Sequence, residues 1–239
     1  GITQSRVRWV AKGTVNERVT MGATLEVNAP ISNDRLGLTL NDGTSPDNAT
    51  ESSSGGGFVT RHTFIWVNHK RMGKISLGQT NAASNGRSET TFSGVNMAAD
   101  SGGVIAGRGL QWIDSTGDAT NAKSLSALTI GSSFTNQDGR SRTDVLRYDT
   151  PRFSGLALAI SAIAGGSWDV GADYRWKDGP IKFRAQAQYN DISATSATEN
   201  GWSVSAAALH DSGLNGAIQV GRGQGNTGAR DPRFWAFDA

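Results

Sequence analysis

Strict alternation of apolar and polar residues is the feature that most constrains this chain. Between Trp168 and Lys177, one parity reads Trp, Val, Ala, Tyr, Trp and the other reads Asp, Gly, Asp, Arg, Lys. Residues 18–29 and 181–190 alternate in the same way. A period of two indicates β-strands. Each segment is about 10 residues long, the length of a tilted strand that crosses a bilayer, whereas strands of soluble proteins run about 5 or 6.

Composition supports an all-β chain and argues against several other classes. Glycine supplies 31 of the 239 residues, and Ser, Thr and Asn are abundant, so few helix-forming runs remain. The formal net charge of +2 is dispersed, and we therefore expect no nucleic-acid partner. The absence of cysteine removes disulfides and thiolate metal sites. No run reaches the roughly 20 apolar residues of a spanning helix, but the strands of a barrel carry only an alternating signal.

The connections between the alternating segments are short and long in turn. The short ones are residues 13–17, 68–73, 149–155, 177–180 and 211–213. The others are residues 30–57, 81–141, 190–201 and 222–232, with only 164–167 brief. Outer-membrane barrels have this asymmetry, with tight turns at one end and long loops at the other. The insert at 81–141 is long enough to form a lid or to fold into a lumen.

No motif predicts a catalytic, metal or cofactor site. Gly223 to Gly228 match a dinucleotide-binding pattern, but no helix follows, and a glycine-rich loop is the better interpretation. The three histidines, His62, His69 and His210, lack the spacing of metal ligands, and no nucleophile elbow is present. We therefore expect no enzymatic activity, no metal and no cofactor.

Charged and aromatic side chains separate by parity. On the polar parity of their segments lie Arg6, Arg8, Lys12, Arg18, Arg61, Lys74, Arg147, Asp173, Arg175, Lys182 and Arg184. These charges could cover the exterior of a soluble sandwich or line a water-filled lumen. On the apolar parity, near strand ends, we place Trp9, Trp66, Tyr148, Trp168, Tyr174, Trp176, Tyr189 and Trp202. Aromatic rings in such positions settle at the headgroup level of a membrane.

Three stretches resemble the general diffusion porins of Gram-negative outer membranes. Residues 147–155 (RYDTPRFSG) resemble their R-Y-D-S-P-x-F-x-G hairpin. Residues 73–79 (GKISLGQ) resemble their G-x-(V/L)-x-L-G-R strand, with Gln79 where many members have Arg. Residues 5–13 (SRVRWVAKG) resemble the S-R-x-G-F-x-G strand near the start of such barrels. The likeness extends along essentially the whole chain.

This resemblance implies a transmembrane antiparallel β-barrel of about 16 strands, with a homotrimeric assembly and an inward-folding third loop. We count about ten complete strands and the start of another, so the resemblance implies a single porin domain over 1–239 that lacks both ends. The constriction loop would lie within 81–141, with Glu89 and Asp100 on its acidic side. Arg6, Arg8 and Arg61 would form the facing basic side, with Arg147 lower on the wall. The other charged residues of the polar parity would line the lumen.

The function predicted from this resemblance is passive diffusion of small hydrophilic solutes and ions through a water-filled outer-membrane channel. Its partners would be outer-membrane lipids, the solutes and two further copies of the chain. A soluble or surface-displayed β-sandwich that binds carbohydrate is the alternative, and it would bury Trp9, Trp66 and Trp202 in a core or ligand platform. An outer-membrane hydrolase is less favoured because no Ser/His pair is placed.

Overall fold

The computed structural model describes residues 6–28, 59–92, 111–113, 125–129, 137–192, 198–225 and 231–238. Its strands are β1 Arg6–Asn16, β2 Val19–Asn28, β3 Val59–His69, β4 Gly73–Asn81, β5 Gln111–Ile113, β6 Leu125–Thr129, β7 Arg142–Asp149, β8 Leu156–Ile163, β9 Trp168–Asp178, β10 Ile181–Asp191, β11 Thr198–His210, β12 Asn215–Gly225 and β13 Arg233–Asp238. The described residues contain no helix long and apolar enough to cross a membrane.

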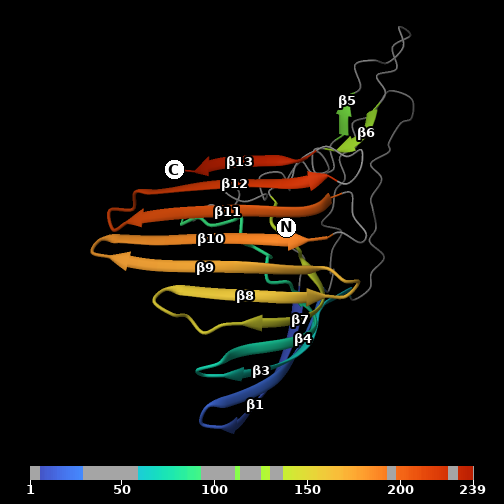
Figure 1. Cartoon of the computed structure of the whole chain (residues 1–239), viewed down its shortest axis with the longest axis vertical. Helices are drawn as coiled ribbons and strands as arrows, with labels where there is room; N and C mark the ends of the chain where they lie inside the picture. Colours follow the sequence, from blue (N-terminus) through green and yellow to red (C-terminus); the bar gives the residue numbers. More distant parts are fainter. Residues whose placement is uncertain are drawn as a thin grey trace.

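Eleven of these strands form one antiparallel sheet in chain order, and only β5 and β6 pair separately (Figure 1). This confirms the all-β prediction and the expected strand number. A soluble sandwich would pack two sheets over a shared core. All the described strands except β5 and β6 instead form one broad sheet, so the sandwich interpretation does not fit.

Short and long connections alternate as expected. The β1–β2, β9–β10 and β11–β12 turns are tight, and Figure 1 shows the last two at the same end of the sheet. Several of the turns use a glycine with a backbone that other residues rarely adopt, for example Gly73 at φ 96° and Gly213 at φ 92°. The connections between β2 and β3 and between β4 and β7 are the long ones. The sheet therefore has short turns at one end and the long connections at the other.

The two faces of the sheet differ in chemistry. In β8, Leu156, Leu158 and Ile160 are exposed on one face, whereas Ala159 and Ser161 are buried on the other. We call these the apolar face and the polar face. The register of neighbouring strands carries the same separation across the sheet; for example, Arg8 lies opposite Glu26 and Trp9 opposite Leu25. The alternation predicted from the sequence is therefore present in the structure.

Strand β3 departs from the parity that we expected. Its Phe64-Ile65-Trp66-Val67 run is apolar on both parities, so hydrophobicity cannot choose a face. Ile65 and Val67 lie exposed on the apolar face. Trp66 lies on the polar face, where a Cβ built on Gly22 would come within 2.6 Å of the indole ring. The prediction that Trp66 belongs to the apolar face is wrong.

Arg18 is a second correction. We expected it on the polar face of a strand that begins at residue 18, but β2 begins at Val19. Arg18 occupies the two-residue turn after β1, where its backbone N–H donates to the Asn16 side chain at 2.9 Å. The side chain is exposed at the end of the sheet that has the short turns, so it does not lie on the polar face of β2.

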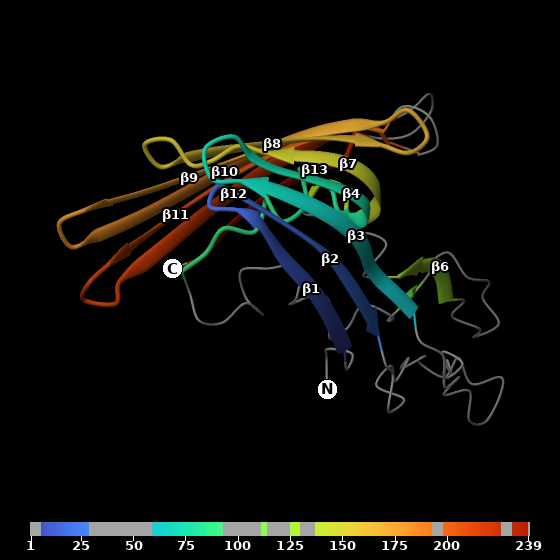
Figure 2. The same cartoon turned by 90° about the horizontal axis from the view of Figure 1, so that it is seen from below.

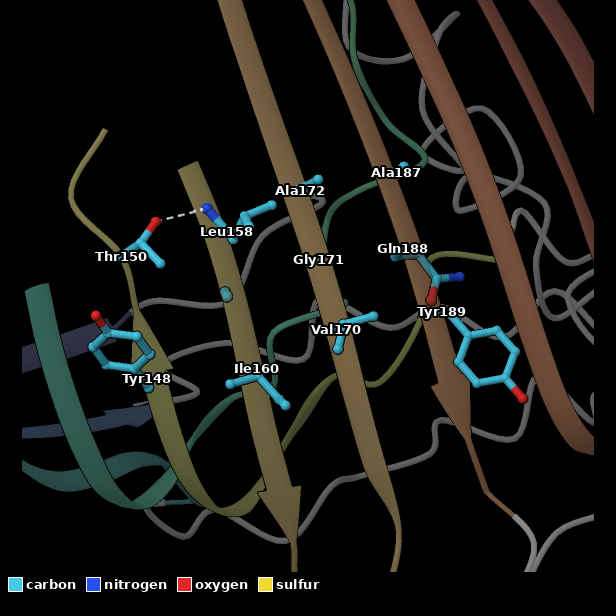
Figure 3. Close-up of a pocket in the computed structure, with 11 residues that line it drawn as sticks. Tyr148, Thr150, Leu158, Ile160, Val170, Gly171, Ala172, Ala187, Gln188 and Tyr189 are labelled. Carbon is cyan, nitrogen blue, oxygen red and sulfur yellow. Dashed lines mark hydrogen bonds between the residues drawn. The ribbon is translucent and has the colours of Figure 1, made fainter. Parts of the chain in front are cut away.

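The apolar face carries a depression of about 510 Å³ across β7 to β10 (Figure 3). Tyr148, Ile160, Val170 and Tyr189 form one row across four paired strands. The small Ala172 occupies the next row, which leaves the space between the two tyrosines open. Because this depression lies on the apolar face, it cannot hold a solute that travels along the polar face.

The sheet is strongly curved. Figure 2 shows that β1, β2 and β3 turn away from the plane of β9 to β12. The segment after β4 lies on the concave side, against the polar face of the sheet. Curvature therefore gathers the polar side chains of the strands around a shared concave space.

Candidate functional site

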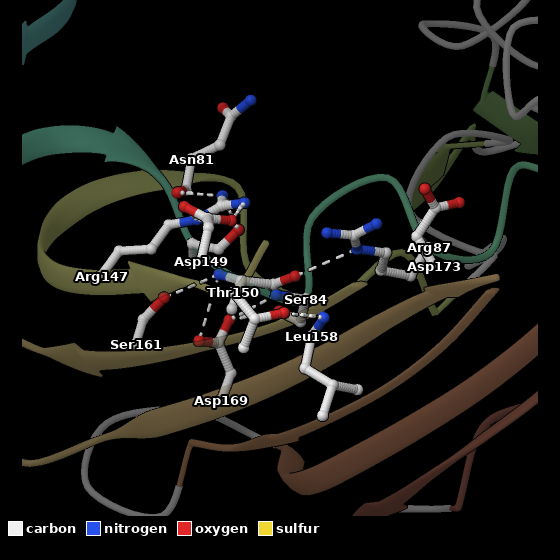
Figure 4. A network of polar contacts seen from close by, with 12 residues as sticks. Asn81, Ser84, Arg87, Arg147, Asp149, Thr150, Leu158, Ser161, Asp169 and Asp173 are labelled. Carbon is white, nitrogen blue, oxygen red and sulfur yellow. Dashed lines mark hydrogen bonds and ion pairs between the residues drawn. The ribbon is translucent and has the colours of Figure 1, made fainter. Parts of the chain in front are cut away.

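The described ends of the long insert, residues 81–92 and 137–141, are fastened to the polar face of the sheet, and Figure 4 shows contacts of the first of these ends. Asp169 of β9 is fully buried, and its carboxylate accepts the N–H groups of Ala83 at 3.2 Å and Ser84 at 2.9 Å. The same carboxylate accepts the Ser84 hydroxyl at 2.5 Å. Ser161 of β8 also accepts the Ala83 N–H, at 2.7 Å. These contacts fix the beginning of the insert above β8 and β9.

Arg147 of β7 ties the same segment from the other side. Its Nη1 donates to the carbonyl oxygens of Asn81 at 2.9 Å and Ala82 at 3.0 Å. Its Nε and Nη2 bind the carboxylate of Asp149 on the same strand, with the closest contact at 2.6 Å. The guanidinium therefore connects a strand carboxylate with the chain that leaves β4.

Glycine on the wall lets the insert approach the backbone of the sheet. A Cβ on Gly171 would lie 2.3 Å from the Ala83 carbonyl oxygen and 3.0 Å from Arg87 Nε. Gly201 and Gly221 play the same part for the other end of the insert, where a Cβ would lie 2.9 Å from the Gln137 side chain in both cases. Any larger residue at these positions would push the insert away from the wall.

Further polar contacts extend the attachment to β10 and β11. The Thr90 hydroxyl lies 2.6 Å from the Gln186 side-chain amide. Ser205 donates from its hydroxyl to the Arg87 carbonyl at 2.7 Å and lies 2.8 Å from the Thr90 hydroxyl. Gln188 donates to the Gln137 carbonyl at 2.9 Å. The segment thus crosses the polar face from β8 to β11.

A basic cluster lies on the opposite part of the concave face, on β1 to β3. Arg8 and Arg61 both bind the carboxylate of Glu26, Arg61 at 2.8 Å. Arg61 reaches it from a β-bulge, because His62 pairs with Glu26 and Thr60 pairs with Val27 in the register. Glu26 is only 3% exposed, whereas Arg8 is 58% exposed. Arg8 therefore faces the solvent above a buried carboxylate, whereas the side chain of Arg61 is largely covered.

A second cluster surrounds Asp173 of β9. Arg152, Arg175 and Arg184 all donate to this carboxylate, at 2.5, 3.0 and 2.9 Å. Arg175 and Arg184 lie directly opposite each other in the register of β9 and β10. Like charges in such positions repel, so the shared carboxylate offsets their repulsion.

The remaining residues predicted for the site divide between the two sides. Arg6 and Lys12 lie on the exposed β1, on the parity of Arg8. Lys74 lies on the polar face of β4, and Lys182 on that of β10. Glu89 belongs to the segment held above β10 and β11, between Ser88 and Thr90. Asp100 lies outside the described residues. Whether these residues line a constriction stays a prediction.

Sequence reasoning missed several residues of this site. Glu26 and Asp169 sit on the polar parity, but alternation does not show which charges pair or which backbone they bind. Arg152 was visible only as part of a hairpin motif, although it binds Asp173. The extra residue of the bulge at Arg61 also left no signal in the sequence. Within the described ranges, no three His, Asp or Glu side chains gather where they could hold a metal ion.

A curved antiparallel sheet with an apolar outer face, a polar concave face and an insert fastened inside is the wall of a transmembrane β-barrel. A family profile described as Gram-negative porin matches residues 1–239. The chain belongs to this family of Gram-negative porins, and its place is the outer membrane.

The solved structures that match the chain share little sequence identity with it. The anion-selective porin from Comamonas acidovorans is 14% identical with a TM-score of 0.53, over 99% of this chain and 63% of that chain. This chain therefore spans less than two thirds of that porin's length. An Rh. blastica porin mutant is 15% identical with a TM-score of 0.44, over 98% of this chain and 73% of that chain. OmpT of Vibrio cholerae is 13% identical with a TM-score of 0.43, over 98% and 72%. No curated protein sequence matches the chain.

Proposed function

We propose that this chain forms the wall of an outer-membrane channel, through which small hydrophilic solutes and ions diffuse passively. The observation that carries the proposal is the insert fastened by Asp169, Ser161 and Arg147 across the polar face. A segment in that position makes the concave space narrower but does not fill it. The exposed apolar side chains on the outer face suit contact with lipid.

The charges of the concave face give the channel its selectivity in this proposal. Arg6, Arg8 and Arg61 form the basic side, and Glu26 neutralises part of their charge from beneath. Glu89, and Asp100 further along the insert, supply the acidic side. Opposed charges across water create a transverse field, which permeating ions sense. Arg147, Lys12, Lys74, Asp173, Arg175, Lys182 and Arg184 act along the wall.

As a channel, the protein would act without catalysis, as a homotrimer surrounded by lipid. A water-filled channel catalyses no reaction, and porin family membership favours a channel over an enzyme. The resemblance to general diffusion porins supports a homotrimer. Outer-membrane lipids would surround the apolar face, where exposed Trp9, Trp168 and Trp202 supply amphipathic rings.

Planar-bilayer recording under a salt gradient tests the proposal. Neutral replacement of Arg6, Arg8 and Arg61 together should move the reversal potential toward cation preference. Glu26→Gln should move it toward anion preference, because the two guanidiniums lose their buried counter-charge. Both shifts should shrink as salt rises, since the Debye length falls from about 10 Å at 0.1 M to about 3 Å at 1 M. Absence of discrete conductance would overturn the channel, and unchanged potentials at low salt would remove these residues from the constriction.

A further inference from the structure

Two aromatic rings and a lysine form an unusual group on the polar face of β3 and β4. Phe64 and Trp66 share the face of Glu26, whereas Trp9, Trp168, Trp176 and Trp202 lie exposed on the apolar face. Both rings are only partly buried. In a channel wall, they are therefore open to the solvent of the concave space.

The neighbours of these rings leave room beside them. In the register, Trp66 lies between Gly22 of β2 and Ser76 of β4. Phe64 likewise lies between Thr24 and Gly78. Each ring is thus flanked by small residues, and Gly22 lets the indole lie directly against the β2 backbone. A flat solute could reach the indole past the small Gly22 and Ser76, whereas the His62 ring lies edge-on beside Phe64, with the ring centroids 6.2 Å apart.

Lys74 is the charged member of the group. Its Nζ lies 5.5 Å from the centroid of the Phe64 ring and 5.4 Å from that of the Trp66 ring. Among the described residues, no carboxylate lies within ion-pair distance of this ammonium. Asp149 lies opposite Lys74 in the register, but its oxygens bind the Arg147 guanidinium. The ammonium therefore lies over the two rings, with Asp149 as an opposite charge beyond ion-pair distance.

We propose that Phe64, Trp66 and Lys74 form a binding site for small aromatic carboxylates on the channel wall. The solute's carboxylate would pair with the Lys74 ammonium, and its ring would stack against the indole and phenyl groups. Neither contact alone is selective, because an ammonium attracts any anion and an aromatic ring packs against any apolar surface. Together they favour a solute that carries both groups. The inference rests on the proposed channel, because it specifies a class of solute that the channel would bind.

Binding at such a site must be weak for the solute to leave, and the experiment uses two readouts. The first is saturation-transfer NMR between the reconstituted protein and benzoate, acetate or benzyl alcohol. The second is the reduction of chloride current by the same solutes in planar bilayers. The NMR readout needs no conduction, so failure of the channel proposal and failure of the site are distinguishable.

The variants separate ring from charge. Trp66→Ala and Lys74→Gln should each weaken benzoate binding about tenfold, which corresponds to about 1.4 kcal/mol. Trp202→Ala removes an indole from the apolar face, and Lys177→Gln removes an exposed ammonium at the end of β9, far from β3 and β4 in the strand order, so both should leave benzoate binding unchanged. If Trp66→Ala misfolds, Lys74→Gln still tests the site.

Benzoate binding stronger than that of acetate and of benzyl alcohol supports the site, provided that Lys74→Gln removes the difference. The site is overturned if benzoate and acetate bind alike, if benzyl alcohol matches benzoate, or if Trp202→Ala lowers binding as much as Trp66→Ala. Conduction that persists with any of these results leaves the channel proposal intact.

Discussion

Replacement of Asp169 by alanine should release the beginning of the insert from the wall. The carboxylate accepts three hydrogen bonds, from the N–H of Ala83 and from the N–H and hydroxyl of Ser84. Ser161 still accepts the Ala83 N–H in the variant, so the two donors of Ser84 lose their acceptor. A buried donor without a partner costs about 1–3 kcal/mol, which gives about 2–6 kcal/mol for both. At the lower limit, the population in which the segment is detached rises about 30-fold.

Hydrogen–deuterium exchange of the peptide that covers residues 82–90 measures this opening. Asp169→Ala should accelerate its exchange by at least about 30-fold. Asp169→Asn keeps one acceptor oxygen, so its effect should be smaller. Asp144→Ala serves as the matched control, because this aspartate is exposed on the apolar face of β7, away from the insert. Equal exchange in Asp169→Ala and Asp144→Ala would refute the view that Asp169 anchors the insert.

Two further predictions concern the lipid-facing surface and the β12–β13 connection. Leu158→Arg on the apolar face should lower the free energy of unfolding in lipid by about 2–4 kcal/mol, and Ala157→Arg on the polar face should lower it less; equal losses would contradict the assignment of faces. In the connection, the hydrogen bond from Arg222 at 2.7 Å, helped by the Gly225 N–H, holds the pKa of Asp231 below its ordinary value of 3.8. Its contribution to stability is therefore complete above about pH 4 and is lost as the pH falls through the lower folded pKa. A carboxyl ¹³C titration should show a midpoint below 3.8 that Arg222→Gln raises, and an unchanged midpoint would disprove the contact.

Alternation predicted the sheet because burial on two faces is a period-two property of the backbone. It placed Leu158 and Ala159 correctly, since one side chain is large and apolar and the other is small. It failed at Trp66, where four apolar residues in a row satisfy both parities. It failed at Arg18 because two residues suffice for the turn, and the strand therefore begins later than the charge pattern suggested.

The candidate site was only partly visible in the sequence. Position along the chain suggested that the insert lies inside, but its anchors come from strands far away in sequence. Asp169 looked like one more polar-face residue, although three donors from the insert converge on it. Glu26 was indistinguishable from a solvated carboxylate until the bulge brought Arg61 to it. Pairing and approach depend on three-dimensional register, which alternation alone does not encode.

The anchoring of the insert also has a kinetic consequence. Its hydrogen bonds join residues 78 positions apart at Ser161 and 118 positions apart at Ser205. The acceptors and donors on the wall come from β7 to β11, so they exist as a set only after those five strands have paired. Closing so long a loop costs entropy before any of these bonds repays it. The insert therefore docks late in folding. Before it docks, the concave space of the sheet is wider than in the folded protein.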